Sequence, residues 1–192
     1  RSKGRINVED VIEFPTRYDD GIYGVCNQER DSGETVFLTV GRLGWFKGWK
    51  LMIDAFRLVC KSLDNARLYF IGDGEDHDKI RDYVKKLGMD NTVILLGKKS
   101  PEDIAKWLNK ADVFVMGSMA EGWSTTLVEA CACGVPCVVT DFSSAREMIK
   151  DNHNGYVVEG RDEIVFSKRM IDALSLDRAK VAEYDKRFEK LA

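Results

Sequence analysis

Six short runs of β-branched and aromatic residues, the first beginning at residue 36, constrain the fold of this chain most strongly. Runs of this length and composition are typical of strands. Because most of them are apolar on both faces, we expect a parallel sheet that is covered on both sides. The runs are VFLTV (36–40), RLYFI (67–71), TVILL (92–96), DVFVM (112–116), PCVVT (136–140) and GYVV (155–158).

Helical patterns separate these runs. Between the first two, Met52, Ala55, Phe56 and Val59 follow the i, i+3, i+4, i+7 spacing of an amphipathic helix. The segment PEDIAKWLNK (101–110) predicts another helix, with proline at a tolerated early position. This alternation predicts a doubly wound, Rossmann-like α/β fold, with a mostly parallel sheet and helices on both faces.

The chain has enough apolar material for one well-buried domain, since 44% of its 192 residues are hydrophobic. We assign residues 36–175 to the α/β domain, 1–35 to a lead-in segment and interdomain connection, and 176–192 to a carboxy-terminal surface helix. The first residue, Arg1, is not methionine, so we expect a fragment of a longer protein.

Composition disfavours several classes of protein. The net charge of −3 provides no general basic field for nucleic acid. No apolar stretch is long enough to span a bilayer, and the amino terminus has no signal-peptide pattern. Three of the five cysteines crowd residues 131–137 instead of spreading as a disulfide framework. We therefore expect a cytoplasmic protein, either free in the cytoplasm or at the cytoplasmic face of a membrane.

The segments that follow the predicted strands are where function is expected, because ligands of open α/β sheets bind beyond the carboxyl ends of the strands. Four of these five segments begin with glycine, which allows close approach of a ligand to the backbone. They are GRLGWFKG (41–48), GDGEDH (72–77), GKKSP (97–101), GSMAEGWST (117–125) and DFSS (141–144). Gly41, Gly72 with Asp73, and Gly97 with Lys98 are thus candidate ligand-binding residues.

Arg42 and Lys47 share the first of these loops. Two cations placed there can neutralise a diphosphate without a metal ion. The alternative is that both are solvated surface charges.

The fourth loop enters a helix that opens with Ser124, Thr125 and Thr126. Free backbone N–H groups, hydroxyls and the positive end of a helix dipole together form an anion site, and phosphate is the ligand expected there. The segment is neither a P-loop nor a G-x-G-x-x-G motif. The missing glycine fingerprint also disfavours a dehydrogenase.

Glu121 and Glu129 flank this anion site. Eight helical residues span roughly 12 Å, whereas the carboxylates of hydrolytic pairs lie about 5 to 9.5 Å apart. Two acceptors on either side of a diphosphate site fit the hydroxyl groups of a nucleotide-sugar. The alternative for Glu129 is a capping box with Thr126, in which the glutamate only closes the start of the helix.

Two patterns in the sequence contain residue types that bind metal ions. Asp76-His77-Asp78 matches the Asp-x-Asp motif of metal-dependent sugar transferases, but it opens a predicted helix, where acidic residues favour the dipole. The spacing of Cys131, Cys133, Cys137 and His153 matches no ordinary zinc pattern, and the cysteines have core character. We predict no metal site and no cofactor.

Four tryptophans are candidates for stacking on a sugar or base. Trp49 and Trp107 fall in predicted helices and are expected in the core. Trp45 and Trp123 fall on the loops after strands and retain a possible stacking role.

These motifs, in this order, resemble the donor-binding half of a glycosyltransferase family 4 enzyme with the GT-B architecture. The resemblance runs from about Val36 to Val158. It is carried by VGRLGWFKGWKLMIDAF, LYFIGDGED, VILLGKKSPEDIAKWLNKADVFVMGSMAEGWSTTLVEACACGVPCVVTD and AREMI. Enzymes of this family are retaining, and the donor phosphate is thought to take the acceptor proton on the same face of the sugar.

The resemblance implies a role for each candidate residue. Arg42 and Lys47 would contact the donor diphosphate and stabilise the departing nucleotide. Glu121 would face the transferred sugar, and Glu129 the ribose hydroxyls. The remaining donor-binding residues would be the segment Gly122, Trp123, Ser124, Thr125, Thr126 and Leu127 at the phosphate, and Gly97 with Lys98 near the base.

The resemblance also implies partners. The donor would be a UDP-, GDP- or ADP-sugar, and the acceptor a glycan, a lipid-linked sugar or a small molecule, as in polysaccharide biosynthesis. By the resemblance, we expect an acceptor-binding amino-terminal domain that lies outside this sequence. We therefore expect little transfer by the chain alone, and any membrane association would occur through that domain. Alternative functions are a sugar-nucleotide epimerase of the same architecture and a non-catalytic nucleotide-binding or assembly module.

The sequence departs from the family pattern at two places. Glu121-Gly122-Trp123-Ser124 stands where the family often has Glu-Gly-Phe-Gly, which narrows the backbone freedom of the turn. The usual Asn-Gly-Val-Asp has no clear counterpart near Phe14 and Pro15.

Overall fold

The structure is a computed structural model that describes residues 18–26 and 33–186. Phe14 and Pro15 lie outside these residues. The strands are β1 (Thr35–Val40), β2 (Ala66–Ile71), β3 (Val93–Leu95), β4 (Val113–Met116), β5 (Cys137–Thr140) and β6 (Gly155–Val158). All six predicted strands are confirmed, with bounds within one residue of those expected.

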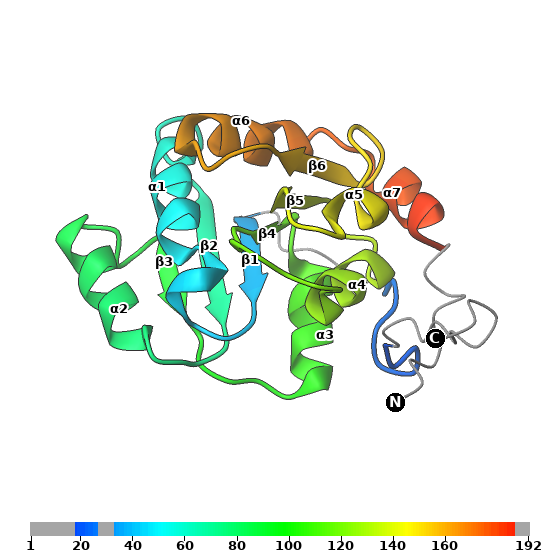
Figure 1. Cartoon of the computed structure of the whole chain (residues 1–192), viewed down its shortest axis with the longest axis horizontal. Coiled ribbons are helices and arrows are strands. Elements are labelled where there is room, and N and C mark those ends of the chain that lie inside the picture. Colours follow the sequence, from blue (N-terminus) through cyan, green and yellow to red (C-terminus); the bar gives the residue numbers. More distant parts are fainter. Residues whose placement is uncertain (1–17, 27–32, 187–192) are drawn as a thin grey trace, which may run out of the picture.

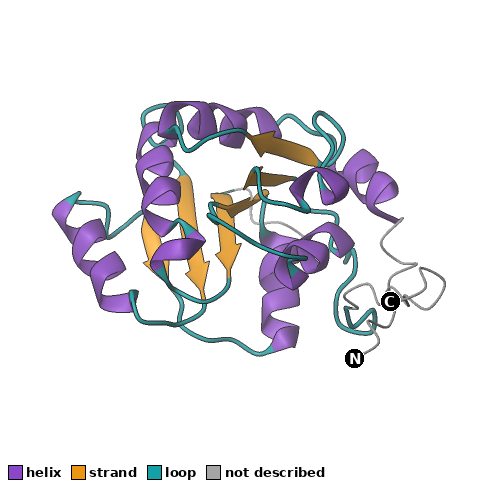
Figure 2. Ribbon diagram, viewed as in Figure 1, coloured by secondary structure: helices purple, strands orange, loops and turns teal. Residues whose placement is uncertain are grey.

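Helices connect each pair of successive strands, and further helices follow the last strand of the described chain (Figures 1 and 2). They are the short 3-10 helix η2 (Trp45–Lys47), α1 (Trp49–Val59), α2 (His77–Lys86), α3 (Pro101–Lys110), α4 (Thr125–Ala132), α5 (Ala145–Met148), α6 (Glu163–Ala173) and α7 (Arg178–Asp185). The amphipathic pattern around Phe56 is the buried face of α1. Pro101 occupies the first turn of α3, and Ser100 caps that helix by accepting from the Asp103 N–H.

The six strands form one parallel sheet in the order β3-β2-β1-β4-β5-β6. The chain first builds outward from β1 to β3 and then returns to place β4 on the other side of β1. The direction of building therefore reverses between β1 and β4. Ligands of doubly wound sheets bind in the crevice at such a point.

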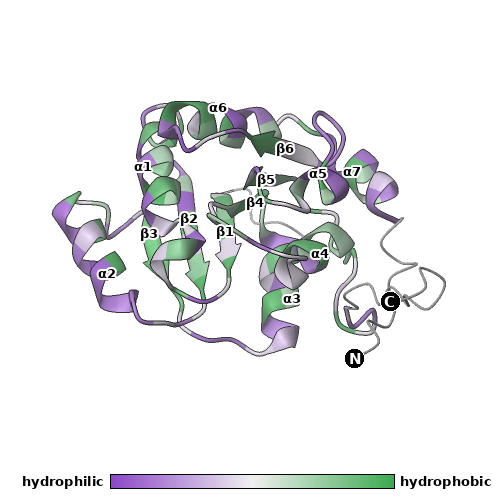
Figure 3. Ribbon diagram, viewed as in Figure 1, coloured by the Kyte–Doolittle hydropathy of each residue, from purple (hydrophilic) through white to green (hydrophobic). Residues whose placement is uncertain are grey.

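Side chains of alternate strand residues enter two separate cores, as the strand period of two requires. In β1, Leu38 packs into the core shared with α3, α4 and α5, whereas Phe37 packs into the core shared with α1, α2 and α6. Figure 3 shows apolar strands in the centre and hydrophilic residues on the outer helices. The predicted covering of the sheet on both faces is confirmed.

The described part of the lead-in segment packs on the domain. Tyr18 and Tyr23 are buried in the core beside α4. Asn109 of α3 binds the backbone of this segment twice, accepting from Cys26 N at 2.8 Å and donating to Gly24 O at 2.9 Å. Near the other end of the described chain, α7 packs on α4 with Val181 buried. Within the described ranges, no helix is long and apolar enough to cross a bilayer.

Candidate functional site

The loops after β1 and β4 meet where the sheet order reverses. Met119 N donates to Phe46 O at 2.8 Å, which joins the two loops through their backbones. Gly48, with φ of 69°, lies so close to the second loop that an added Cβ would be 1.7 Å from Gly117 O. Only glycine adopts this conformation and allows this approach without strain, so both loops depend on it for their positions.

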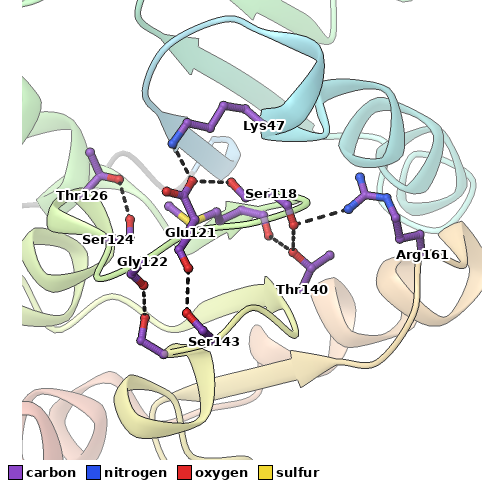
Figure 4. Close-up of polar contacts among 11 residues, drawn as sticks. Lys47, Ser118, Glu121, Gly122, Ser124, Thr126, Thr140, Ser143 and Arg161 are labelled. Atoms are coloured by element: carbon purple, nitrogen blue, oxygen red, sulfur yellow. Dashed lines mark hydrogen bonds and ion pairs between the residues drawn. The ribbon is translucent and has the colours of Figure 1, made fainter.

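Lys47 and Glu121 form the polar centre of this junction (Figure 4). Lys47 Nζ lies 2.5 Å from Glu121 Oε1, and the Ser118 hydroxyl donates to the same oxygen at 2.7 Å. The two charged side chains are only 27% and 15% exposed. A charge pair this sheltered from water attracts more strongly than a surface pair.

Arg42 lies on the outer part of the same first loop and is exposed. Its Nε donates to Glu75 Oε2 at 3.0 Å, an ion pair with the loop that follows β2. The structure thus pairs both predicted diphosphate-binding cations with a carboxylate. A polyanion entering the crevice would compete for both pairs.

The ends of β1, β2 and β3 are joined through the predicted glycines. Gly41 N donates to Ile71 O at 2.9 Å, and Gly72 N donates to Gly97 O at 3.0 Å. Gly72 has φ of 136°, and a Cβ there would lie 1.8 Å from Gly41 O. Asp73 and Lys98 are exposed beside these glycines.

Gly97 and Glu121 follow strands that stand three places apart in the sheet. Neighbouring strands are about 4.8 Å apart, so the two loops are separated by roughly 14 Å. That span fits an extended ligand better than a single ion. Lys98 shares this outer position, apart from the Lys47–Glu121 pair.

Helix α4 begins at Thr125, and its N-cap is Ser124. The Ser124 and Thr126 hydroxyls lie 3.3 Å apart (Figure 4). Thr126 is therefore the second residue of the helix and not its cap, so the capping-box interpretation of Thr126 and Glu129 is wrong. The helix begins at Thr125, so its cap is Ser124, and the N–H groups of the first turn have no partner within the helix itself.

Glu129 lies one turn into α4 and is partly buried. Burial raises the pKa of its carboxyl group to about 7, and an interaction with the Tyr23 hydroxyl opposes part of that rise. Tyr23 comes from the lead-in segment, so Glu129 lies where that segment meets α4.

The other predicted residues of the α4 entry differ in exposure. Gly122 and Thr125 are exposed, whereas Leu127 is fully buried and packs into the core. Trp123 packs partly against the core and its Nε1 is buried without a hydrogen-bond partner among the described residues. Trp45, in contrast, is 64% exposed at the mouth of the first loop.

The residues that match metal-ligand patterns are engaged in contacts within the protein. Asp76 is 1% exposed and accepts from Trp49 Nε1 at 3.0 Å and from Lys79 Nζ at 2.6 Å, next to the start of α2. The three cysteines of 131–137 are buried in α4, just after it and in β5. In the described part of the chain, no three His, Cys, Asp or Glu side chains converge as metal ligands would.

Residues that touch the site but were not assigned roles from the sequence include Tyr23, Glu75, Ser118, Thr140, Ser143, Ser144 and Arg161. Arg161 follows β6, so the rule that led to the other loops would have found it. Ser143 and Ser144 lie in the DFSS segment that the rule did mark. Tyr23 carried no signal, because its contact with α4 is made by a segment without regular structure.

Comparisons with known proteins found similar sequences. A sequence model described as "Glycosyl transferases group 1" matches residues 27–191. A lipopolysaccharide 1,6-galactosyltransferase of Salmonella typhimurium is 36% identical over 130 residues, which is 66% of this chain and 36% of that protein. The chain spans between 25% and 48% of the length of the curated relatives considered.

Solved structures give the same result. The lipopolysaccharide outer core galactosyltransferase WaaB is similar with a TM-score of 0.75 and 27% identity, over 95% of this chain and 53% of that one. Staphylococcus aureus TarM, solved with UDP and a sugar, superposes with a TM-score of 0.79 at 21% identity, over 97% of this chain and 36% of that one. Because the identity to TarM is only 21%, this similarity shows that the folds are alike and no more.

Proposed function

The chain belongs to the family of glycosyl transferases group 1, and we propose that it is the nucleotide-sugar-binding domain of a retaining hexosyltransferase. The observation that carries this proposal is the sheltered Lys47–Glu121 pair at the point where the sheet order reverses. It places a cation for phosphate and an acceptor for sugar hydroxyls side by side, next to the amino terminus of α4.

The proposed donor lies across the carboxyl edge of the sheet. Its diphosphate contacts Lys47, Arg42 and the first N–H groups of α4, which stabilise the departing nucleoside diphosphate. Glu121 accepts hydrogen bonds from the transferred sugar. Glu129 accepts from the ribose, and the base lies toward Gly97 and Lys98. The roughly 14 Å between the outer loops supports a ligand of this length.

We propose a UDP-, GDP- or ADP-sugar as donor, with no metal ion. TarM was solved with UDP, which supports a nucleoside diphosphate in this fold. In the proposed retaining reaction the acceptor hydroxyl attacks on the face from which the nucleotide leaves, and the donor phosphate takes its proton. The acceptor is a glycan, a lipid-linked sugar or a small molecule.

The acceptor is proposed to bind a second, amino-terminal domain. The short span of the chain relative to its relatives supports this. The active cleft then lies between two domains, so that this chain binds donor but transfers little sugar. We place the whole protein in the cytoplasm, and any membrane contact on the other domain.

Transfer from labelled UDP-, GDP- and ADP-hexoses by the two-domain protein tests this function. Glu121→Ala is expected to abolish transfer, whereas Glu102→Ala, a change at an exposed residue of α3, is expected to leave it unchanged. Product analysis should show a glycoside with the anomeric configuration of the donor. An epimerised nucleotide-sugar would indicate the epimerase instead, and full activity of Glu121→Ala would refute the assigned role of Glu121.

A further inference from the structure

The backbone of the loop that carries Glu121 is held by side chains from two other loops (Figure 4). Arg161, between β6 and α6, donates from Nη2 to Gly117 O at 2.9 Å and from Nη1 to Ser118 O at 3.3 Å. Thr140, the last residue of β5, donates from Oγ1 to the same Ser118 O at 2.6 Å. The amino-terminal half of the Glu121 loop is thus fixed to β5 and to the start of α6.

Two serines between β5 and α5 hold the other half of the loop. Ser143 Oγ donates to Glu121 O at 2.8 Å, and Ser144 Oγ donates to Gly122 O. Ser144 is only 6% exposed, so its hydroxyl is directed inward at the loop. Glu121 is therefore held at its backbone by Ser143 and at its carboxylate by Ser118 and Lys47.

These hydrogen bonds fix the backbone of a loop that has no helix or strand hydrogen bonds to order it. Residues 117–124 lie between β4 and α4 and include two glycines, which lose the most conformational freedom when they become ordered. A Cβ on Gly122 would meet nothing within 4 Å, so close packing does not hold the turn there. The direction of the Glu121 side chain consequently depends on the donors that fix the carbonyl groups around it.

We propose that Arg161, Ser143 and Ser144 are positioning residues that hold Glu121 in the orientation in which it receives the transferred sugar, an inference that rests on the proposed function. Among the described residues, the hydrogen bonds of their side chains go to carbonyl groups of this loop and not to Glu129, Gly97 or Lys98. Their loss is therefore expected to weaken recognition of the sugar more than recognition of the nucleotide.

The test compares a nucleoside diphosphate with its sugar ester on the same variants of this chain. Titration calorimetry would use the pairs UDP and UDP-glucose, GDP and GDP-mannose, and ADP and ADP-glucose, and would continue with the pair that binds the wild type. Arg161→Gln and the double variant S143A/S144A are expected to raise the ratio Kd(sugar nucleotide)/Kd(nucleotide) about tenfold, as loss of one or two hydrogen bonds predicts. Arg57→Gln, at an exposed arginine of α1, should leave the ratio unchanged.

Further measurements separate positioning from folding. Arg161→Lys keeps a charged hydrogen-bond donor at this position. Its ratio Kd(sugar nucleotide)/Kd(nucleotide) should therefore lie between those of Arg161→Gln and the wild type. Hydrogen exchange at the amides of Met119 to Gly122 should be faster in Arg161→Gln than in Arg57→Gln, with or without ligand. If Arg161→Gln does not fold, S143A/S144A provides both measurements.

Two results would overturn the positioning role. One is an unchanged ratio, which includes equal weakening of both ligands. The other is unchanged hydrogen exchange in the loop. Failure of the wild type to bind any of the six compounds would instead contradict the proposed function, while the exchange measurement would still report whether these side chains hold the loop.

Discussion

Lys47 Nζ lies 2.5 Å from Glu121 Oε1, and this contact joins the loops after β1 and β4, the two adjacent strands between which the sheet order reverses. The two residues are 74 positions apart in the sequence. The contact therefore exists only because the fold brings these strands together. It places opposite charges where a ligand with both phosphates and hydroxyl groups would meet each of them.

Lys47→Met is expected to weaken binding of a nucleoside diphosphate by about tenfold or more, because charge-assisted hydrogen bonds contribute about 1.5 to 3 kcal/mol. Titration calorimetry measures this. Lys50→Met is the matched control, since Lys50 is an exposed lysine of α1 that pairs with Asp54. Equal affinities for the two variants would contradict a role of Lys47 at the phosphates.

Affinity for a sugar nucleotide is expected to rise between pH 6 and pH 8. Burial raises the pKa of Glu129 to about 7, and only the ionised carboxylate accepts hydrogen bonds from both ribose hydroxyls. The change in ionisation across this range corresponds to about fivefold to tenfold in affinity. A sugar nucleotide is the right probe because its diphosphate lacks the terminal phosphate ionisation near pH 6.

Glu129→Gln should remove most of this pH dependence. If the variant and the wild type keep the same pH profile, the titrating group is not Glu129, and its assignment to the ribose loses its support.

The same carboxyl group should affect stability with the opposite sign. Its folded-state pKa of about 7 lies above the ordinary value of 4.5, so the folded chain binds this proton more tightly than the unfolded chain. The stabilisation from protonated Glu129 is present below about pH 4.5 and is lost as the pH rises to about 7. The Tm of Glu129→Gln relative to the wild type should therefore increase from pH 5 to pH 8. Glu163→Gln, at an exposed residue of α6, should show no such trend.

Gly48→Ala is expected to destabilise the domain more than Gly88→Ala. Both glycines have φ near +65° (69° and 66°), but a Cβ at Gly48 would lie 1.7 Å from Gly117 O, whereas one at Gly88 would meet nothing within 4 Å. The left-handed conformation alone costs about 1 to 2 kcal/mol, and the clash adds about 1 to 3 kcal/mol. Urea unfolding measures both. Equal losses would show that the β1 and β4 loops do not need this close approach.

Most of the fold could be predicted from local patterns. Apolar runs such as VFLTV are separated by helical patterns, and this alternation predicts strands of a parallel sheet. A strand that is buried on both faces needs helices above and below it. The start of α4 was harder to predict. Thr126-x-x-Glu129 satisfies the capping pattern, yet the helix starts earlier, at Thr125 after Ser124.

The site was predictable in its strand-end loops but not in its supporting contacts. Lys47 and Glu121 follow predicted strands, and the strand-end rule marked both. Arg161 and Ser143 also follow strands, but no spacing in the sequence shows which groups they bind. Arg161 donates to the carbonyl groups of Gly117 and Ser118, and Ser143 donates to that of Glu121. Tyr23 reaches Glu129 from a segment without regular structure, and its role likewise emerged only from the fold.

We propose that this chain carries a preformed site for a sugar nucleotide. The most direct measurement is thermal unfolding of the chain with UDP-, GDP- and ADP-sugars. A ligand that binds only the folded state and is present at about 100 times its Kd adds about 2.7 kcal/mol of stability, so one nucleotide class should raise the Tm by several degrees. That shift should be smaller in Lys47→Met than in Lys50→Met. No shift with any of the three classes at millimolar concentration would contradict the claim.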